Sequence, residues 1–210
     1  LKLAAFLSLS LGVIFGIPAL LHDPFPIGVL GAVALIGALG YSGWPFHIKY
    51  KAFGDGAVVF LLGPGVMAGI SLATFGHVPL ATLVAGVFFG FLAEGALHSN
   101  NLQDIPLDTN RNVKTLAMGL GFRTAKIFLF WIYLTSFGLL MTLCFLLKQP
   151  TLSLVAIVMA PYVLKLLKSV SQAEGPLSSS IKGLKEKTET IHMGSGFFMI
   201  SILIYLIFSR

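Results

Sequence analysis

The strongest constraint on the fold is the recurrence of long apolar stretches from one end of the chain to the other. Hydrophobic residues make up 56% of the 210 residues, whereas charged residues make up only 10%. A soluble domain of this length has a single core and cannot bury so many almost uncharged helices. The sequence therefore predicts an all-α fold, a polytopic transmembrane helix bundle.

Seven membrane-spanning helices can be drawn from the apolar stretches. A helix needs roughly 20 mostly apolar residues to cross the hydrocarbon core, and each stretch comes close to that length. Glycine, with 23 residues, lets the backbones of such helices approach closely. The predicted spans are residues 3–21, 27–42, 57–75, 78–97, 125–147, 152–167 and 193–208.

The basic residues alternate in agreement with seven spans. Of the 14 basic residues, only Lys148 and Arg210 fall on the side opposite the N-terminus. The positive-inside rule places the richer side in the cytoplasm, or on the equivalent side of an organelle membrane. The net charge of +6 then reflects topology and contact with the lipid bilayer, so we expect no nucleic-acid partner.

Two carboxylates, Asp104 and Asp108, follow two amides, Asn100 and Asn101, at the end of the fourth predicted span. On a helix, residues i and i+4 share a face, so both aspartates can reach one ligand. Such oxygen ligands suit Mg²⁺, which takes one or two carboxylates together with waters and phosphate oxygens. The alternative is that both aspartates are solvated in a loop, and Pro106 between them would kink a helix there.

Basic and phenolic side chains share the membrane side of these aspartates. The connection after the second span carries Tyr41, Lys49 and Lys51, and the connection after the fourth continues to Arg111 and Lys114. Carboxylates that hold Mg²⁺ and cations that contact phosphate oxygens together suit a metal-bridged diphosphate.

The fourth span also carries ionisable residues of its own. Glu94, His98, Asn101 and Asp108 are spaced so that they follow one helical stripe. An ionisable residue within a membrane span is a functional-site hypothesis by default. The alternative is that Glu94 is a structural partner of His98 at i+4.

Three segments resemble a known family. The stretches YSGWPFHIKYKAFGD (41–55), NNLQDIPLD (100–108) and KTLAMGLG (114–121) are similar to motifs of the UbiA superfamily of intramembrane prenyltransferases. The closest resemblance is to the MenA-like branch, the 1,4-dihydroxy-2-naphthoate polyprenyltransferases. Three motifs in the same order, with the same spans between them, make this resemblance specific.

The resemblance implies nine helices around a lipid-accessible cavity, with the active site at the cytoplasmic end. A polyprenyl diphosphate is held through Mg²⁺ by two aspartate-rich motifs. Ionisation of its allylic C–O bond yields a carbocation that attacks an aromatic quinone precursor. The resemblance thus implies a multi-pass prenyltransferase of menaquinone biosynthesis, in a bacterial inner membrane.

The resemblance also implies roles for individual residues. Asp104 and Asp108 match the second aspartate motif as metal ligands, and Asn100 and Asn101 match its amides. Tyr41, Lys49 and Lys51 lie in the loop that contacts diphosphate, without a choice between the two lysines. The remaining candidates are Lys114 and Arg111 for diphosphate, with Asp55, Glu94 and His98 ranked lower.

The chain departs from the family pattern in its first part. The first aspartate-rich motif, which follows the second helix of the family, does not occur in this sequence, and the chain begins with Leu1. The sequence predicts seven spans, two fewer than the nine helices that the resemblance implies. We therefore expect residues 1–210 to be a single membrane-embedded prenyltransferase domain that lacks its first two helices. The alternative is a short, inactive paralogue.

The loop motifs leave several functions open. The acceptor could be 1,4-dihydroxy-2-naphthoate, homogentisate or 4-hydroxybenzoate, because all three use the same diphosphate machinery. Gln103, where this branch often has arginine, and 112–113, where Gly-Lys is expected, bear on that choice. A membrane transporter with a polar path through Glu94 and His98 is a further alternative. Prenyl chain length and oligomeric state are not encoded in these motifs.

Overall fold

A computed structural model describes residues 2–43, 46–50, 52–111 and 113–209, and within these ranges the fold is helical with no strand. This confirms the predicted all-α bundle. The α-helices are α1 (Lys2–His22), α2 (Pro24–Ser42), α3 (Gly54–Phe60), α4 (Val66–Phe75), α5 (Leu80–Asn110), α6 (Leu116–Leu120), α7 (Phe122–Leu147), α8 (Ser153–Ser171) and α9 (Leu184–Phe208). Three 3-10 turns, η1 (Ile48–Tyr50), η3 (Pro150–Leu152) and η4 (Ser179–Ile181), and one π-helical turn, η2 (Leu61–Gly65), complete the described elements.

Six of the seven predicted spans are long and apolar enough to cross a membrane. The first predicted span differs, because α1 contains only a shorter apolar helix, Phe6–His22. The third span is built from α3, η2 and α4 in series, Gly54–Phe75. Two helices are longer than predicted. The fourth span is expected to end at residue 97, but α5 continues to Asn110, and the seventh is expected to begin at residue 193, but α9 begins at Leu184. The chain is thus an integral, multi-pass membrane protein.

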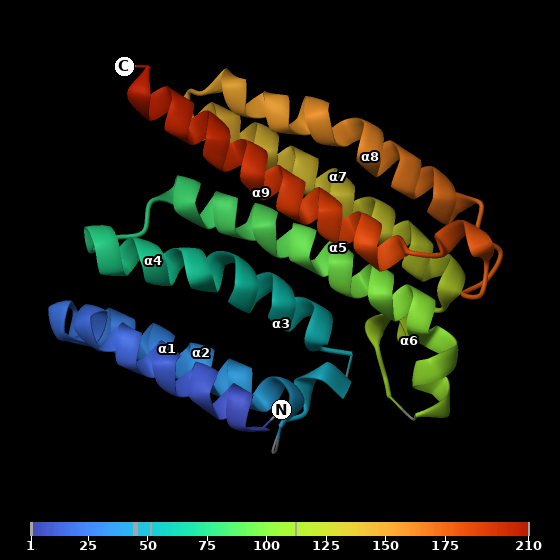
Figure 1. The fold of residues 1–210 in the computed structure, drawn as a ribbon, viewed down its shortest axis with the longest axis horizontal. Coiled ribbons are helices and arrows are strands. Elements are labelled where there is room, and N and C mark those ends of the chain that lie inside the picture. Colours follow the sequence, from blue (N-terminus) through green and yellow to red (C-terminus); the bar gives the residue numbers. More distant parts are fainter. Residues whose placement is uncertain (1, 44–45, 51, 112, 210) are drawn as a thin grey trace.

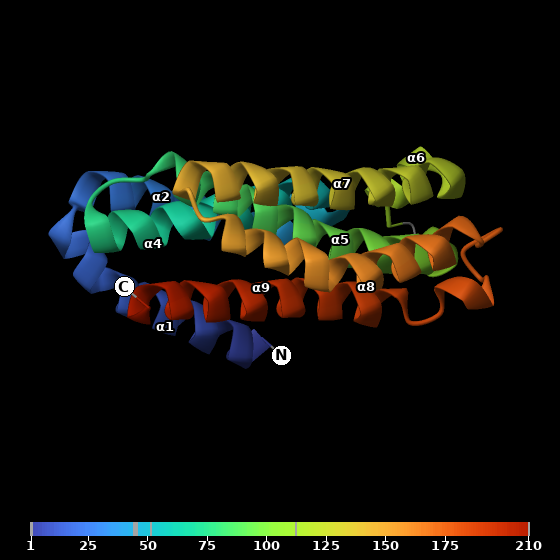
Figure 2. The ribbon, with the colours of Figure 1, turned by 90° about the horizontal axis from the view of Figure 1, so that it is seen from above.

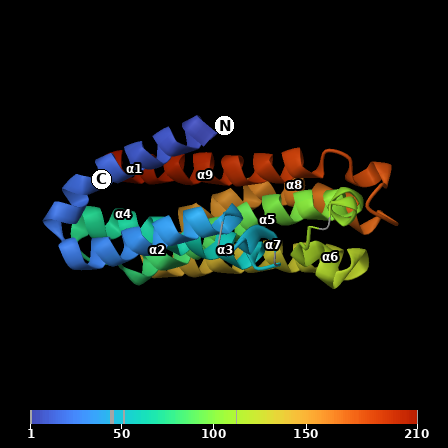
Figure 3. The same cartoon turned by 90° about the horizontal axis from the view of Figure 1, so that it is seen from below.

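Helix α5 forms the centre of the bundle. It packs against α7, α9 and the α3–η2–α4 segment, while α8 covers α7 and α9 (Figures 1 and 2). The most buried side chains come from these helices, with Leu102, Leu129 and Leu184 fully buried. Helices α1 and α2 form an outer pair (Figure 3), and large apolar side chains such as Phe15 and Phe25 on them are exposed. Exposed apolar side chains are stable where lipid surrounds them.

Glycines let α3 and η2 approach α5 closely. A Cβ added to Gly63 would lie 2.9 Å from the Gly90 Cα atom, and one added to Gly86 would lie 2.7 Å from the Pro64 Cα atom. Pro64 lacks an N–H and opens the helix into the π-helical turn, where Gly63 leaves helical geometry at φ −96 and ψ −105. This contact sets the N-terminal turn of α3 beside the middle of α5.

The connections after α2, α5 and α8 gather at one end of the bundle, opposite the C-terminus (Figure 1). The Ala52 backbone N–H donates to the Lys114 carbonyl at 3.1 Å, so two of these connections touch. Gln103 joins the third, because its amide donates to the Ile181 carbonyl at 2.8 Å and accepts from the Lys185 N–H at 3.2 Å. Arginine has no acceptor and could make only the first of these bonds. Glutamine at this position supplies both bonds, whereas arginine would supply one.

The glycine contact predicts the effect of adding one methyl group. We expect Gly90→Ala to lower the free energy of unfolding by about 1–3 kcal/mol, because the Cβ would press on the Val59 carbonyl of α3. Gly69→Ala on α4 is the matched control, since a Cβ there meets nothing within 4 Å. Thermal unfolding in detergent measures both variants. Equal melting temperatures for the two would contradict a close glycine contact.

Candidate functional site

The aspartate pair lies on the last turns of α5 and not in a loop. Helix α5 passes through Pro106 and ends at Asn110, so Asp104 and Asp108 share a helix. Both side chains are half-buried. The Asn100 amide donates to Asp104 Oδ2 at 2.9 Å, which orients that carboxylate. The alternative of a loop is therefore wrong, because both aspartates lie on a helix. The Asn100 amide, predicted to accompany the pair, contacts Asp104 directly.

Cations lie around Asp108. The charges of Lys49 on η1 and Arg111 at the end of α5 act on its carboxylate, together with the like charge of Asp104. Arg111 also caps α5, because its backbone N–H donates to the Asp108 carbonyl at 3.1 Å. Lys114 is held nearby through its backbone bond to the connection after α2, while Lys51 lies outside the described residues. Carboxylates and cations thus meet at one end of the bundle.

Asn101 lies on the stripe of α5 that carries Asp108, whereas Tyr41 comes from the end of α2. Asn101 is buried, with 8% of its surface exposed. Tyr41, at the end of α2, is half-buried, and its hydroxyl lies 3.6 Å from where a Cβ on Gly54 would stand. The carboxylates of Asp55 and Glu94 act on this hydroxyl. The structure therefore groups Tyr41 with the start of α3.

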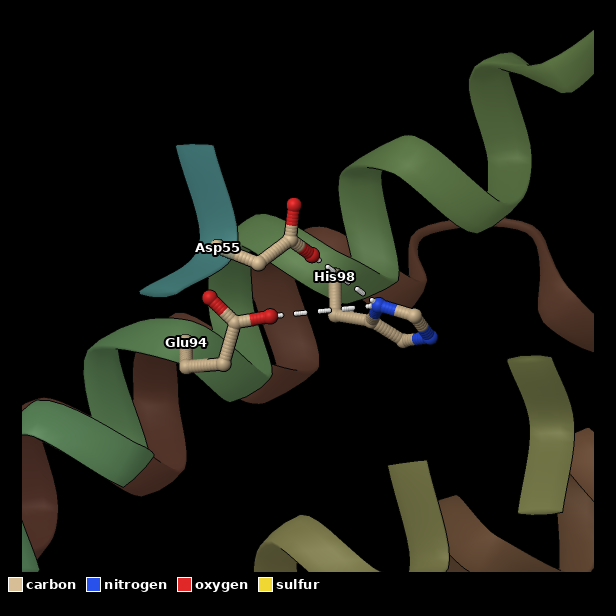
Figure 4. A group of neighbouring side chains, drawn as sticks. All are labelled: Asp55, Glu94 and His98. Atoms are coloured by element: carbon tan, nitrogen blue, oxygen red, sulfur yellow. Dashed lines mark hydrogen bonds and ion pairs between the residues drawn. The ribbon is translucent and has the colours of Figure 1, made fainter. Parts of the chain in front are cut away.

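A buried cluster of Asp55, Glu94 and His98 lies between α3 and α5 (Figure 4). His98 Nδ1 is 3.3 Å from Asp55 Oδ1 and 3.9 Å from Glu94 Oε1. The other ring nitrogen, Nε2, is 3.0 Å from the Ala125 carbonyl oxygen of α7. The ring also packs edge-on against Phe128, with the two centroids 4.9 Å apart.

The Ala125 carbonyl fixes the tautomer of His98. A carbonyl oxygen only accepts, so Nε2 carries the hydrogen and Nδ1 faces the two carboxylates. Glu94 is 1% exposed, and neither of its oxygens has a hydrogen-bond partner within the described ranges. The i+4 pair of Glu94 and His98 expected from the sequence exists, but Asp55, ranked low there, is the closer partner of the ring.

An apolar cavity of about 630 Å³ separates α2 from the α3–η2–α4 segment. Among the described residues that line it, Tyr41 is the one with a polar side chain. The others are Ile27, Leu30, Gly31, Val33, Ala34, Gly37, Ala38, Ala57, Val58, Leu61, Leu62, Gly65, Val66, Gly69 and Ile70. A cavity of this size and lining suits a flexible hydrocarbon chain.

Two contributors to the site carry no sequence signal of their own. The Ala125 carbonyl orients His98 through the backbone, and any residue there could supply it. Gln103 holds the connection before α9. Only the packing of α5 against α7 and α9 brings these groups to the site.

The chain is similar to several known proteins. It is 38% identical over 119 residues to the 1,4-dihydroxy-2-naphthoate octaprenyltransferase of Mycobacterium tuberculosis, which covers 56% of this chain and 40% of that protein. The protein of the same name in Mycobacterium leprae is 35% identical over the same shares. The UbiA prenyltransferase domain-containing protein 1 of Dictyostelium discoideum is 27% identical and covers 76% of this chain and 46% of that protein.

The chain thus spans less than half the length of these relatives. No solved structure matches it significantly. The sequence profile of the UbiA prenyltransferase family, however, matches residues 1–178, which is most of the chain. This chain belongs to the UbiA prenyltransferase family.

Proposed function

We propose that this protein transfers a polyprenyl group from a polyprenyl diphosphate to an aromatic acceptor. The observation that carries the proposal is that the connection after α2 adjoins both parts: Tyr41, where it begins, lines the apolar cavity, and the charge of Lys49 within it acts on Asp108 at the end of α5. Asp104, Asp108 and Lys49 supply charge for a diphosphate, and the cavity beside Tyr41 supplies an apolar environment for a prenyl chain. All 210 residues form one membrane-embedded domain in this proposal.

The proposed acceptor is 1,4-dihydroxy-2-naphthoate, in the biosynthesis of menaquinone. The mycobacterial relatives, at 35% and 38% identity, are named for octaprenyl transfer to this compound. The three loop motifs also resemble that branch more than those that prenylate other quinone precursors. Homogentisate and 4-hydroxybenzoate are the acceptors against which this choice is to be tested.

The donor set at the end of α5 fits Mg²⁺. Asp104 and Asp108 offer carboxylate oxygens one helical turn apart, and the Asn100 amide already orients one of them. Hard oxygen ligands of this kind suit Mg²⁺, which keeps several waters and binds substrate phosphate oxygens. When bound, Mg²⁺ neutralises the negative charge that builds up on the departing diphosphate.

The residues of the chain divide the remaining work. Lys49, Lys51, Lys114 and Arg111 bind diphosphate oxygens, with Tyr41 and Asn101 as further polar contacts. The allylic C–O bond breaks and its electron pair leaves with the diphosphate. A ring carbon of the acceptor then donates a pair to the allylic cation, forming the C–C bond, and the ring loses a proton. An apolar pocket that excludes water keeps the cation from being hydrolysed.

The active-site connections face the cytoplasm in this proposal. All but Lys148 and Arg210 of the basic residues fall on that side of the seven-span topology. The diphosphate group is charged and does not cross a bilayer unaided, so a cytoplasmic site would meet that group at the aqueous face while the prenyl chain stays in the lipid. The host membrane is proposed to be the bacterial inner membrane.

The metal-binding role predicts a loss of activity without a loss of fold. In the full-length protein, Asp104→Asn should lower kcat by about 100-fold or more, because one carboxylate that holds the metal is gone. The readout is Mg²⁺-dependent release of diphosphate from a polyprenyl diphosphate and an aromatic acceptor. Asp23→Asn at the α1–α2 turn is the control, since this side chain makes no capping hydrogen bond. Turnover retained by Asp104→Asn would contradict the proposed role of Asp104 in prenyl transfer.

The cavity predicts the choice of prenyl chain. Ala34→Phe fills part of the lining, so the kcat/KM of long donors should fall about tenfold relative to short ones. Ala32→Phe, exposed on the same helix and outside the lining, should leave this ratio unchanged. Donors of two lengths, assayed against one acceptor, measure the ratio. An unchanged ratio in Ala34→Phe would place the prenyl chain elsewhere.

A further inference from the structure

We propose that Asp55, Glu94 and His98 bind a transition-metal dication, at a site separate from the Asp104 and Asp108 pair. The three ligand atoms lie within 4.8 Å of one another and come from α3 and α5. All three residues are buried, with at most 5% of the surface of any of them exposed. The proposed Mg²⁺ ligands of prenyl transfer, Asp104 and Asp108, are not part of this site. The proposal can therefore be tested independently of the proposed function.

The orientation of His98 argues for a cation at Nδ1. Nε2–H donates to the Ala125 carbonyl, so the lone pair of a neutral ring points from Nδ1 toward Asp55 Oδ1, 3.3 Å away. A lone pair facing a carboxylate oxygen at this distance is repulsive unless positive charge lies between them. A histidine whose second nitrogen donates to a backbone carbonyl is also the usual arrangement of a metal ligand.

Glu94 distinguishes a metal from a shared proton. A proton between His98 and Asp55 would account for their 3.3 Å distance, but Glu94 would then need a second proton of its own, shared with Asp55. Both Glu94 oxygens are buried without a hydrogen-bond partner among the described residues, and the nearer one is 3.9 Å from Nδ1. A desolvated carboxylate without a partner is costly. A dication bound by all three side chains satisfies the Glu94 oxygens and the Nδ1 lone pair together.

The distances and the donor types point to the class of metal. Bonds from Zn²⁺ to nitrogen and carboxylate oxygen are about 2.0–2.2 Å, which sets neighbouring ligand atoms roughly 3–3.5 Å apart. The separation of 3.3 Å already meets this, and that of 3.9 Å needs a small rotation of Glu94. Imidazole suits zinc, iron and similar metals, whereas Mg²⁺ prefers oxygen alone. The mixed set therefore selects Mn²⁺, Fe²⁺ or Zn²⁺ over Mg²⁺.

A metal here would tie three helices together. Asp55 stands in the first turn of α3, directly after the connection that carries Lys49, and Glu94 and His98 stand on α5. The Ala125 carbonyl adds α7 through the His98 ring. The bound metal would hold the connection after α2 at a fixed position relative to the aspartate pair, so its role is positioning.

Mn²⁺ provides the test because its electron spin reports nitrogen ligands. The purified full-length protein is loaded with Mn²⁺ alone, and electron spin echo spectroscopy records any ¹⁴N coupling. We expect a directly bound nitrogen whose coupling changes to that of ¹⁵N when histidine is ¹⁵N-labelled. His98→Gln should abolish it. Asp104→Asn should keep it, because the aspartate pair offers only oxygen ligands.

A second variant guards against misfolding of His98→Gln. Glu94→Gln has the same shape and no charge, and it should weaken Mn²⁺ binding at the nitrogen-containing site at least tenfold while the melting temperature without metal is kept. A wild-type protein without nitrogen coupling would overturn the proposal in favour of a proton shared in the cluster. Coupling that persists in His98→Gln, or unchanged affinity in Glu94→Gln, would overturn it as well.

Discussion

The close contact of α3 and η2 with α5 is the constraint on which the rest of the structure depends. Gly63, Gly86 and Gly90 remove the side chains that would hold these backbones apart, and Pro64 opens the helix where they meet. In a bilayer, lipid competes for apolar surface as well as another helix does, so close backbone packing supplies much of the association energy. Without this contact, Asp55 could not reach Glu94 and His98.

Helix α5 carries two clusters of polar side chains at different depths. Its middle holds Glu94 and His98, enclosed by α3 and α7, and its last turns hold Asp104 and Asp108 among cations. Between these levels, Gln103 joins α5 to the connection before α9. A rigid helix can fix such groups relative to one another more firmly than a loop can. The two clusters differ in donors, since the inner one includes an imidazole and the outer one offers oxygens.

Some of the site follows from local rules and some does not. The i+4 spacing of Asp104 and Asp108 and of Glu94 and His98 predicts a shared face on any helix, and both pairs lie on α5. The polar residues after 97 predict a loop, whereas packing continues α5 to Asn110. The sequence ranks Asp55 low, because its contact with His98 spans 43 residues of chain and no local pattern indicates it.

The sequence by itself determined the class of protein, six of the spans and the family. Apolar length and charge bias are properties of single segments, and the three loop motifs are contiguous, so none of them needs a tertiary structure to be recognised. The tertiary structure alone decided that Asp55 joins Glu94 and His98 and that the Ala125 carbonyl fixes the ring. These contacts depend on how closely helices approach and at what register. That is set by glycines and side-chain packing over the whole bundle, and not by the residues that meet there.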